Sequence, residues 1–343
     1  RCLRERRRSR GLRARSSVES YTGTKWPLIV SATGTGKTKM AHYIAIPYLE
    51  RGERVLWLAH RGLLLKQALA SKNETWPQFS GGIVQADRNE CSAQIVYASK
   101  DTVRNAARLD EVLKHGAFSL VVVDEAHHSP SASYQEVLAR LSGSGAKVLG
   151  LTATPSAKME SQYEVVFSFG ILEGVASGAL VVPYAALRLI PIDLSGVKML
   201  GQDYDQEDLA DTLMEGHVVE HTVDALKSEH TFERLPLRDD SVTGRAHGGI
   251  GVYCANVRQA QATAKALCEA GFRARAVWGA GHKTKEGADR MTVADIDRIV
   301  SAFNAGTIDV LCNCDLLTEG NDMPIMKSIL LARPTRSRSL FMQ

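Results

Sequence analysis

Short apolar runs rich in β-branched residues alternate with longer stretches of helical periodicity along this chain. That alternation is typical of parallel sheets flanked by helices. In the first half, the apolar runs predict strands at 28–30, 55–59, 95–98, 120–123 and 148–151. Ligands gather at the carboxyl ends of the strands in such sheets. The pattern therefore predicts an α/β fold whose functional residues directly follow its strands.

The rhythm changes between about residues 155 and 249, where acidic helical sequence precedes a loop rich in turn formers. A second α/β series follows, with strands predicted at 249–254, 273–278, 308–314 and 328–332. A chain of 343 residues is also too long for one typical core. We therefore expect four parts: an Arg-rich, disordered tail at 1–20, a parallel-sheet domain at 21–160, a linking region at 161–245 and a second parallel-sheet domain at 246–343.

The composition, 44% hydrophobic and 23% charged, is that of an ordinary soluble globular protein. Residues 1–15 hold eight arginines and one glutamate, a net charge of +7, so the remaining residues carry −3 of the total of +4. This start could be a nucleic-acid arm or a targeting segment, but it lacks the apolar stretch of a secretory signal. No run approaches the roughly 18 to 20 apolar residues that cross a bilayer. We expect a soluble protein without a membrane span.

The six cysteines do not form paired C-x-x-C ligand sets. Cys312 and Cys314 alternate with Leu311 and Asn313 in a strand-like run, which predicts that both occupy one buried face. Reduced thiols in a cytoplasmic protein are the favoured state.

The stretch "SATGTGKT", residues 31–38, lies between a predicted strand and a helical stretch. Its glycines allow backbone N–H groups to face a phosphate, to which the following helix adds its positive end. In such a loop Lys37 reaches the β- and γ-phosphates and the Thr38 hydroxyl holds Mg²⁺. The alternative is a Gly-rich turn with a surface lysine. The favoured prediction is a nucleoside triphosphate site formed by Thr33, Gly34, Thr35, Gly36, Lys37 and Thr38.

A second stretch, "VVVDEAHHSP" at 121–130, ends an apolar run with two acids and two histidines. Downstream of a phosphate loop, Asp124 is placed to bind Mg²⁺, and Glu125 can orient the water that attacks the γ-phosphate. A zinc site is the alternative, disfavoured because adjacent histidines do not easily face one ion and no further ligand set lies nearby. We interpret His127 as a relay and His128 as an exposed or capping side chain.

Together, "SATGTGKT", "LAHRGLLLKQA", "VVVDEAHH" and "LTATP" resemble the motifs of the superfamily-two DEAD/DEAH-box helicases and translocases. The similarity is greatest to the restriction-subunit and XPB-like branch and extends over about 25–343. It implies two RecA-like domains with a cleft in which ATP and Mg²⁺ bind and hydrolysis drives movement along nucleic acid. It also implies that Glu125 is the catalytic carboxylate, acting with Lys37 and with the water-mediated magnesium ligand Asp124.

The resemblance implies further contacts with nucleic acid or with the nucleotide. Thr152 and Thr154 of "LTATP" would link nucleotide state to the nucleic acid, with His127 as their contact. His60 and Arg61 would touch the sugar-phosphate backbone, which is sequence-neutral, although a solvated helix is the alternative there. The resemblance further implies that nucleic acid is contacted by Ser99, Lys100 and Thr318. It implies that Gly320 and Asp322 lie near the nucleotide.

Two departures from the family pattern affect these expectations. The segment "RARSSVESYTGTKW" has no clear equivalent of the adenine-reading "RxYQ", and "ARPTRSRSLFMQ" precedes the place where relatives carry the arginines of motif VI. We therefore expect a truncated second domain and a helicase or translocase favouring DNA over RNA, with possible nuclease or specificity subunits as partners. The alternative is a catalytically impaired fragment that binds nucleic acid or a partner.

Overall fold

The computed structural model describes residues 2–60, 62–86, 88–183, 185, 187–201, 203–228, 249–279, 291–314, 323 and 325–337, without the side chains of 2–4. The chain divides into two compact units, with the boundary between Val182 and Pro183. Each unit is built around its own sheet, and each is described separately.

The first unit contains an eight-stranded sheet with the order β4-β3-β5-β2-β6-β7-β1-β8. Every neighbouring pair is parallel except β3 and β4. Because β6, β7 and β1 are adjacent, residues far apart in the sequence reach the same carboxyl edge. The strands are β1 (Trp26–Ser31), β2 (Arg54–Ala59), β3 (Gly81–Gln85), β4 (Arg88–Asn89), β5 (Ile95–Ser99), β6 (Phe118–Val123), β7 (Lys147–Thr152) and β8 (Tyr163–Phe169).

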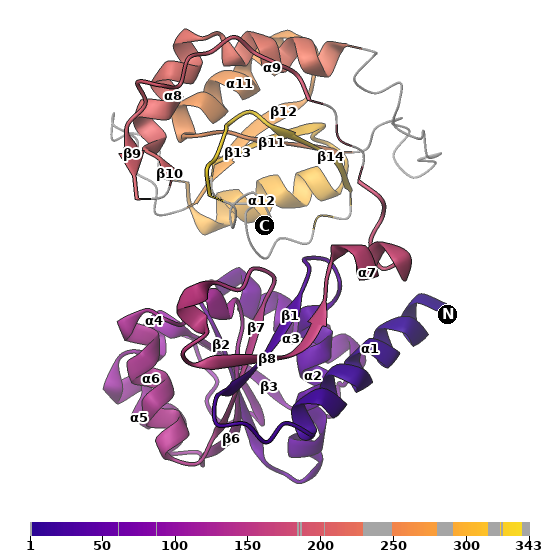
Figure 1. The fold of residues 1–343 in the computed structure, drawn as a ribbon, viewed down its shortest axis with the longest axis vertical. Coiled ribbons are helices and arrows are strands. Elements are labelled where there is room, and N and C mark those ends of the chain that lie inside the picture. The colour runs from indigo at the N-terminus through magenta and orange to yellow at the C-terminus, as the bar shows by residue number, and fades with distance from the viewer. Residues whose placement is uncertain are drawn as a thin grey trace. The chain divides into compact units, whose positions relative to one another are not determined.

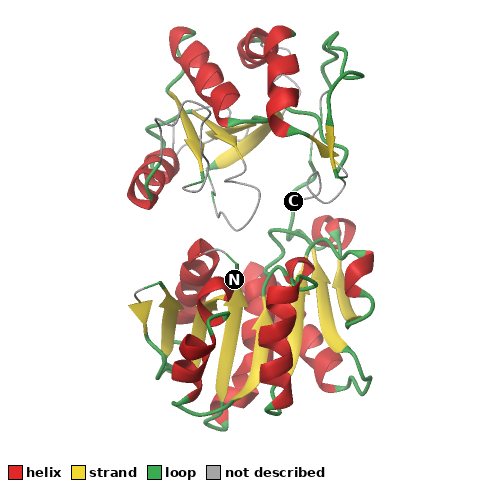
Figure 2. Ribbon diagram, turned by 90° about the vertical axis from the view of Figure 1, so that its left-hand side faces the viewer, coloured by secondary structure: helices red, strands yellow, loops and turns green. Residues whose placement is uncertain are grey.

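Helices cover both faces of this sheet (Figures 1 and 2). Alternate strand residues such as Leu56 and Trp57 belong to different clusters, one packed with α4, α5 and α6 and the other with α1, α2 and α3. The near-continuous apolar strands follow from this burial on two faces. The helices are α1 (Cys2–Glu19), α2 (Lys37–Glu50), α3 (Gly62–Thr75), α4 (Lys100–Val103), α5 (Ala106–Leu113), η1 (Ala126–His128), α6 (Ala132–Gly143), η2 (Ala157–Met159) and α7 (Ile171–Ala176).

The Arg-rich start is a helix, and the expectation of a disordered tail at 1–20 is wrong. Helix α1 packs against α2 and β8. Its Arg10 is only 6% exposed, with the guanidinium 5.0 Å from the centre of the Phe169 ring. A Cβ on Gly11 would lie 2.2 Å from the Tyr43 ring, so the close approach of α1 to this ring requires glycine at that position. Tertiary packing of one helix face therefore overrides the compositional signal for disorder.

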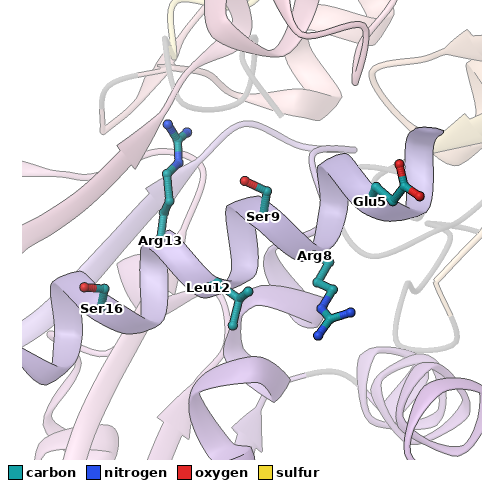
Figure 3. A pocket seen from close by; sticks show the side chains of 6 residues that line it. All are labelled: Glu5, Arg8, Ser9, Leu12, Arg13 and Ser16. Atoms are coloured by element: carbon teal, nitrogen blue, oxygen red, sulfur yellow. The ribbon is translucent and has the colours of Figure 1, made fainter. Parts of the chain in front are cut away.

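Much of the rest of α1 is exposed to solvent. An open hollow is lined entirely by this helix, and Figure 3 shows Arg8 and Leu12 pointing to one side of the helix and Arg13 to the other. Arg6 reaches the carbonyl of Ser177, after α7. The positive charge of the chain's start is thus concentrated on one ordered helix.

The first unit extends beyond the expected boundary at 160. Strand β8 pairs with β1 in parallel, from Trp26 opposite Tyr163 to Ser31 opposite Phe169. The run "YEVVFSF" is therefore an edge strand of the first sheet instead of linking sequence.

The second unit contains a four-stranded parallel sheet with the order β12-β13-β11-β14. Helices α9 and α11 pack on one face and α12 on the other. Cys312 and Cys314 are both buried in β13, as predicted. The strands are β9 (Met199–Leu200), β10 (Asp203–Tyr204), β11 (Gly249–Tyr253), β12 (Ala274–Trp278), β13 (Val310–Cys314) and β14 (Met326–Leu331), and the helices are α8 (Gln206–Glu215), α9 (Val218–Lys227), α11 (Val257–Glu269) and α12 (Val293–Asn304).

The acidic stretch expected to link two domains belongs to this second unit. It forms two helices, α8 and α9, broken at His217, whose φ is 58°. Leu209 and Val218 pack with Ala255, which follows β11, and Leu226 packs with the sheet. The α/β class with parallel sheets, predicted from periodicity, is confirmed in both units.

Candidate nucleotide site at the edge of the first sheet

The loop between β1 and α2 has the backbone that its glycines permit. Gly34 and Gly36 have φ values of 80° and 95°, in the left-handed region where L side chains are strained. A Cβ on Gly36 would meet nothing within 4 Å, so glycine is required there by conformation and not by space. Thr33 and Gly34 are exposed, which leaves this side of the loop accessible.

Hydroxyl groups hold the base of the loop. Ser31 is fully buried, and its Oγ lies 2.6 Å from Oγ1 of Thr35, which also donates to the carbonyl of Ala32. Ser31, where the general motif has glycine, is therefore part of the internal bonding of the loop. Thr35 as a whole is 1% exposed, so its hydroxyl serves the internal bonding of the loop.

The amino end of α2 presents a cation and uncapped N–H groups. Gly36 is the N-cap and has no side chain to accept hydrogen bonds from the first turn. Lys37 Nζ lies 3.2 Å from the carbonyl of Ser31 and donates to it. Thr38 follows, half-buried in the same turn. The positive helix end and the ammonium together favour an anion at this point.

Asp124 lies at the neighbouring strand end and is 5% exposed. Its backbone N–H donates to the carbonyl of Leu58, continuing the ladder between β6 and β2. Burial, and then the charge of Glu125, raises the pKa of Asp124 to about 6, while the Lys37 cation acts in the opposite direction. A buried carboxylate next to a second carboxylate is electrostatically costly when ionised, and a bound metal ion would relieve that cost.

Asp124→Asn is therefore expected to stabilise the first unit in the absence of nucleotide. The folded-state pKa of about 6 exceeds the ordinary 3.8, so ionisation destabilises the fold as pH rises through this interval and fully so above it. We expect a gain of about 2 kcal/mol in the free energy of unfolding at pH 7.5, which vanishes below about pH 4. Urea unfolding at both pH values measures it. The exposed Asp110→Asn is the control, and an equal gain at both pH values would contradict the argument.

Glu125, His127 and Thr152 are in contact beside Asp124. Glu125 has a φ of 49°, an unusual left-handed conformation for a residue with a side chain. His127 Nδ1 lies 3.4 Å from Glu125 Oε2 and 3.1 Å from Thr152 Oγ1. The Thr152 Oγ1 also accepts a hydrogen bond from the Thr154 N–H at 3.1 Å. The side chains of Glu125 and His127 are 14% and 12% exposed, so the group is partly accessible.

Strand order explains why these residues meet. Ser31–Thr38 follows β1, Thr152 ends β7, and Asp124 follows β6, and the three strands are adjacent. The register places Val30 opposite Thr152 and Val123 opposite Gly150. The 31–38 loop, two carboxylates and a histidine thus share the carboxyl edge of one sheet, which is where parallel sheets bind ligands.

The other residues expected from the sequence lie further along the same edge or outside the described residues. Ser99 ends β5 and is 6% exposed. Lys100 pairs with Asp101 at 2.8 Å and lies over the Tyr134 ring. His60 follows β2 and is half-buried. Arg61, Thr318, Gly320 and Asp322 lie outside the described residues.

His128 is the residue whose environment the sequence did not reveal. Instead of being an exposed or capping side chain, it is half-buried, and its ring centre lies 4.1 Å from that of His127 and 4.4 Å from that of His60. The adjacency of two histidines was visible in the sequence, but the approach of His60 depends on the pairing of β2 with β6.

Among the described residues, no three His, Cys, Asp or Glu side chains converge on a point suited to a metal ion. Asp124 with Thr38 nevertheless offers the carboxylate and hydroxyl oxygens that Mg²⁺ uses when most of its ligands are water and phosphate. Among the same residues, no helix has the length and apolar character needed to span a membrane.

Known sequences are similar to this chain over much of its length. The family model described as "Type III restriction enzyme, res subunit" matches residues 6–157. The putative ATP-dependent helicase IRC3 of Saccharomyces cerevisiae is 29% identical, over 94% of this chain and 46% of that protein. A 51.5 kDa protein of a Lactococcus phage is 27% identical, over 92% and 61%. The chain thus spans about half the length of these curated relatives.

Solved structures share the fold at low sequence identity. Mycobacterium smegmatis helicase Lhr bound to ssDNA and AMP-PNP matches 94% of this chain and 41% of its own, with a TM-score of 0.59 and 16% identity. S. cerevisiae Dbp5 bound to RNA and ADP BeF3 matches 94% and 74%, with a TM-score of 0.57 and 14% identity. These similarities concern the fold of the two units.

Proposed function

We propose that this chain, which belongs to the superfamily-two helicases and translocases of the restriction-subunit branch, binds ATP with Mg²⁺ and hydrolyses it to move along nucleic acid. The observation that supports this most is the junction of the Lys37 loop with Asp124, Glu125 and Thr152 at one sheet edge. This chain covers 61% and 46% of the two curated relatives. Their activities are therefore not assigned to it, and its own activity is a proposal.

In the proposed site, the loop N–H groups and Lys37 bind the β- and γ-phosphates. On binding, Lys37 Nζ exchanges its hydrogen bond to the Ser31 carbonyl for phosphate oxygens. The Thr38 hydroxyl and, through water, the Asp124 carboxylate would hold Mg²⁺, which neutralises charge on the phosphate oxygens. Asp124 is ionised above a pH of about 6, its raised pKa. Metal affinity would therefore fall in acid, where this carboxylate is protonated.

Glu125 is the proposed acceptor for the attacking water. Its carboxylate is partly exposed and oriented by His127 at 3.4 Å. A carboxylate in this place can accept a hydrogen bond from water and orient it toward the γ-phosphate. It can take the water's proton as the new P–O bond forms and the bond from the γ-phosphorus to the β–γ bridging oxygen breaks, with ADP as the leaving group. His127, through Thr152 and the Thr154 N–H, connects the carboxylate to the end of β7.

We propose that nucleic acid lies along the same edge, in contact with His60, Ser99 and Lys100. His60 and Ser99 follow β2 and β5, which are neighbouring strands. Contacts to phosphate and sugar would leave movement independent of base sequence. DNA is favoured because the matching family model describes restriction-enzyme subunits, and a nuclease or specificity subunit is a corresponding partner.

A binding module without turnover is the second candidate, supported by the exposed arginines of α1. Steady-state ATP hydrolysis with duplex DNA, single-stranded DNA or RNA separates the two candidates. We expect one DNA form to raise the rate by about tenfold, a typical size for coupling between two sites. Lys37→Ala is the blank. ATP binding without hydrolysis in every condition, together with salt-sensitive DNA affinity that ATP leaves unchanged, would instead favour the binding module.

A further inference from the structure

Three histidine rings form a continuous row at the candidate site. His60 follows β2, and His127 and His128 lie in η1 after β6. The ring centres of His60 and His128 are 4.4 Å apart with an interplanar angle of 56°, and those of His128 and His127 are 4.1 Å apart at 43°. Rings this close are in van der Waals contact, so one cannot move without affecting the next.

Backbone pairing fixes the two ends of the row. Strands β2 and β6 are paired with Leu58 opposite Val123, and the Asp124 N–H donates to the Leu58 carbonyl at 2.9 Å. This ladder sets the position of the chain on either side of the rings. The His128 N–H donates to the Glu125 carbonyl at 3.0 Å, which closes the turn in which Glu125 has its left-handed conformation.

The row ends on the proposed catalytic carboxylate. His127 Nδ1 approaches both Glu125 at 3.4 Å and Thr152 at 3.1 Å. A single ring nitrogen carries at most one hydrogen, and an ionised carboxylate only accepts hydrogen bonds. A small rotation of the His127 ring therefore changes the balance between its contacts with Glu125 and Thr152. Since the conformation of Glu125 is itself unfavourable by about 1 kcal/mol, its position depends on such contacts.

We propose that His60 and His128 are positioning residues that transmit contact with the nucleic-acid backbone at the end of β2 to Glu125 through His127. This inference rests on the proposed function, because it assigns to His60 the nucleic-acid contact proposed above. A backbone phosphate or sugar that displaces the His60 ring shifts His128 against His127, which reorients Glu125. His128 is then required for stimulation of hydrolysis by nucleic acid without touching ATP or nucleic acid itself.

The test is a double-mutant cycle with His60→Ala and His128→Ala. The readouts are the ratio of the hydrolysis rate constants with and without saturating nucleic acid, and nucleic-acid affinity from fluorescence anisotropy without nucleotide. We expect His128→Ala to lower the ratio by about tenfold with affinity changed less than about twofold. The double variant should be no worse than the more impaired single variant, because both changes interrupt one row.

His128→Phe is the rescue variant, because it retains an aromatic ring of similar width between the two neighbours. It should recover most of the stimulation, which a role limited to hydrogen bonding would not predict. The exposed His115→Ala is the matched control and should leave both readouts unchanged.

The outcomes separate this inference from the proposed function. If the unaltered protein shows no stimulation by any nucleic acid, the proposed function fails and the inference fails with it. If the unaltered protein is stimulated but His128→Ala retains the full ratio, or if the two single effects add, only the row of histidines is overturned. A fall in His128→Ala that accompanies an equal loss of affinity would likewise overturn it, since it would assign His128 to binding.

Discussion

Glu125→Gln is expected to lower the rate constant of ATP hydrolysis by about 10² to 10⁴ while leaving ATP binding intact. Glutamine keeps the size of the side chain and can still accept a hydrogen bond at its amide oxygen. It has no charge and cannot take a proton from the attacking water. The loss should therefore appear in the rate constant at saturating ATP and not in the concentration of ATP required for half-saturation.

The measurement is single-turnover hydrolysis alongside equilibrium binding of a fluorescent ATP analogue. Glu136→Gln is the control, because Glu136 is exposed on α6 in the same unit. It removes the same charge without altering the candidate site. Hydrolysis by Glu125→Gln at the rate of this control would remove Glu125 from the catalytic role and require another acceptor for the water's proton.

Lys37→Ala is expected to weaken ATP binding by about 10²-fold and to reduce hydrolysis at fixed ATP by at least as much. Two charge-assisted hydrogen bonds to phosphate, each contributing roughly 1.5–3 kcal/mol, are lost with the ammonium. The Ser31 carbonyl also loses the donor that lies 3.2 Å from it, so the empty loop becomes less well ordered. Both effects weaken ATP binding.

Lys39→Ala provides a matched comparison for this variant. Lys39 lies two residues further along α2 and pairs with Glu74 at 3.2 Å, on the surface of the unit. An exposed pair of this kind contributes roughly 0–1 kcal/mol, so ATP binding should be nearly unchanged. Equal weakening by the two substitutions would show that the general charge of the helix, and not the position of Lys37 in the loop, governs binding.

The first-half strands were predicted from periodicity because each is an apolar run with clear ends. The runs at 55–59 and 120–123 correspond to β2 and β6, which are longer by one and two residues at their starts. β3 was missed because "GGIVQ" opens with two glycines, which are unfavourable in strands. β8 has a strand-like sequence, but it lies where the change of rhythm suggested linking sequence.

Residues of the candidate site were likewise predictable where their environment is local, and were missed where it depends on other strands. Gly36 and Lys37 could be placed from the sequence because a phosphate-binding loop is local and its conformation is set by neighbouring residues. The contact of His127 with Thr152 was anticipated from family resemblance, and the structure shows it at 3.1 Å. His128 was misjudged because the partner that covers it, His60, is supplied by another strand.

By itself, the sequence determined the local features of this protein: the alternation of strands and helices, the left-handed glycines of the loop, and the placement of acids and histidines directly after apolar runs. Only the tertiary structure decided which strand ends meet, because strand order depends on burial and pairing between segments far apart in the chain. It also decided that the Arg-rich start folds. Arg10 and Gly11 are buried against α2 and β8, which lie further along the chain and cannot be identified as partners from the local sequence.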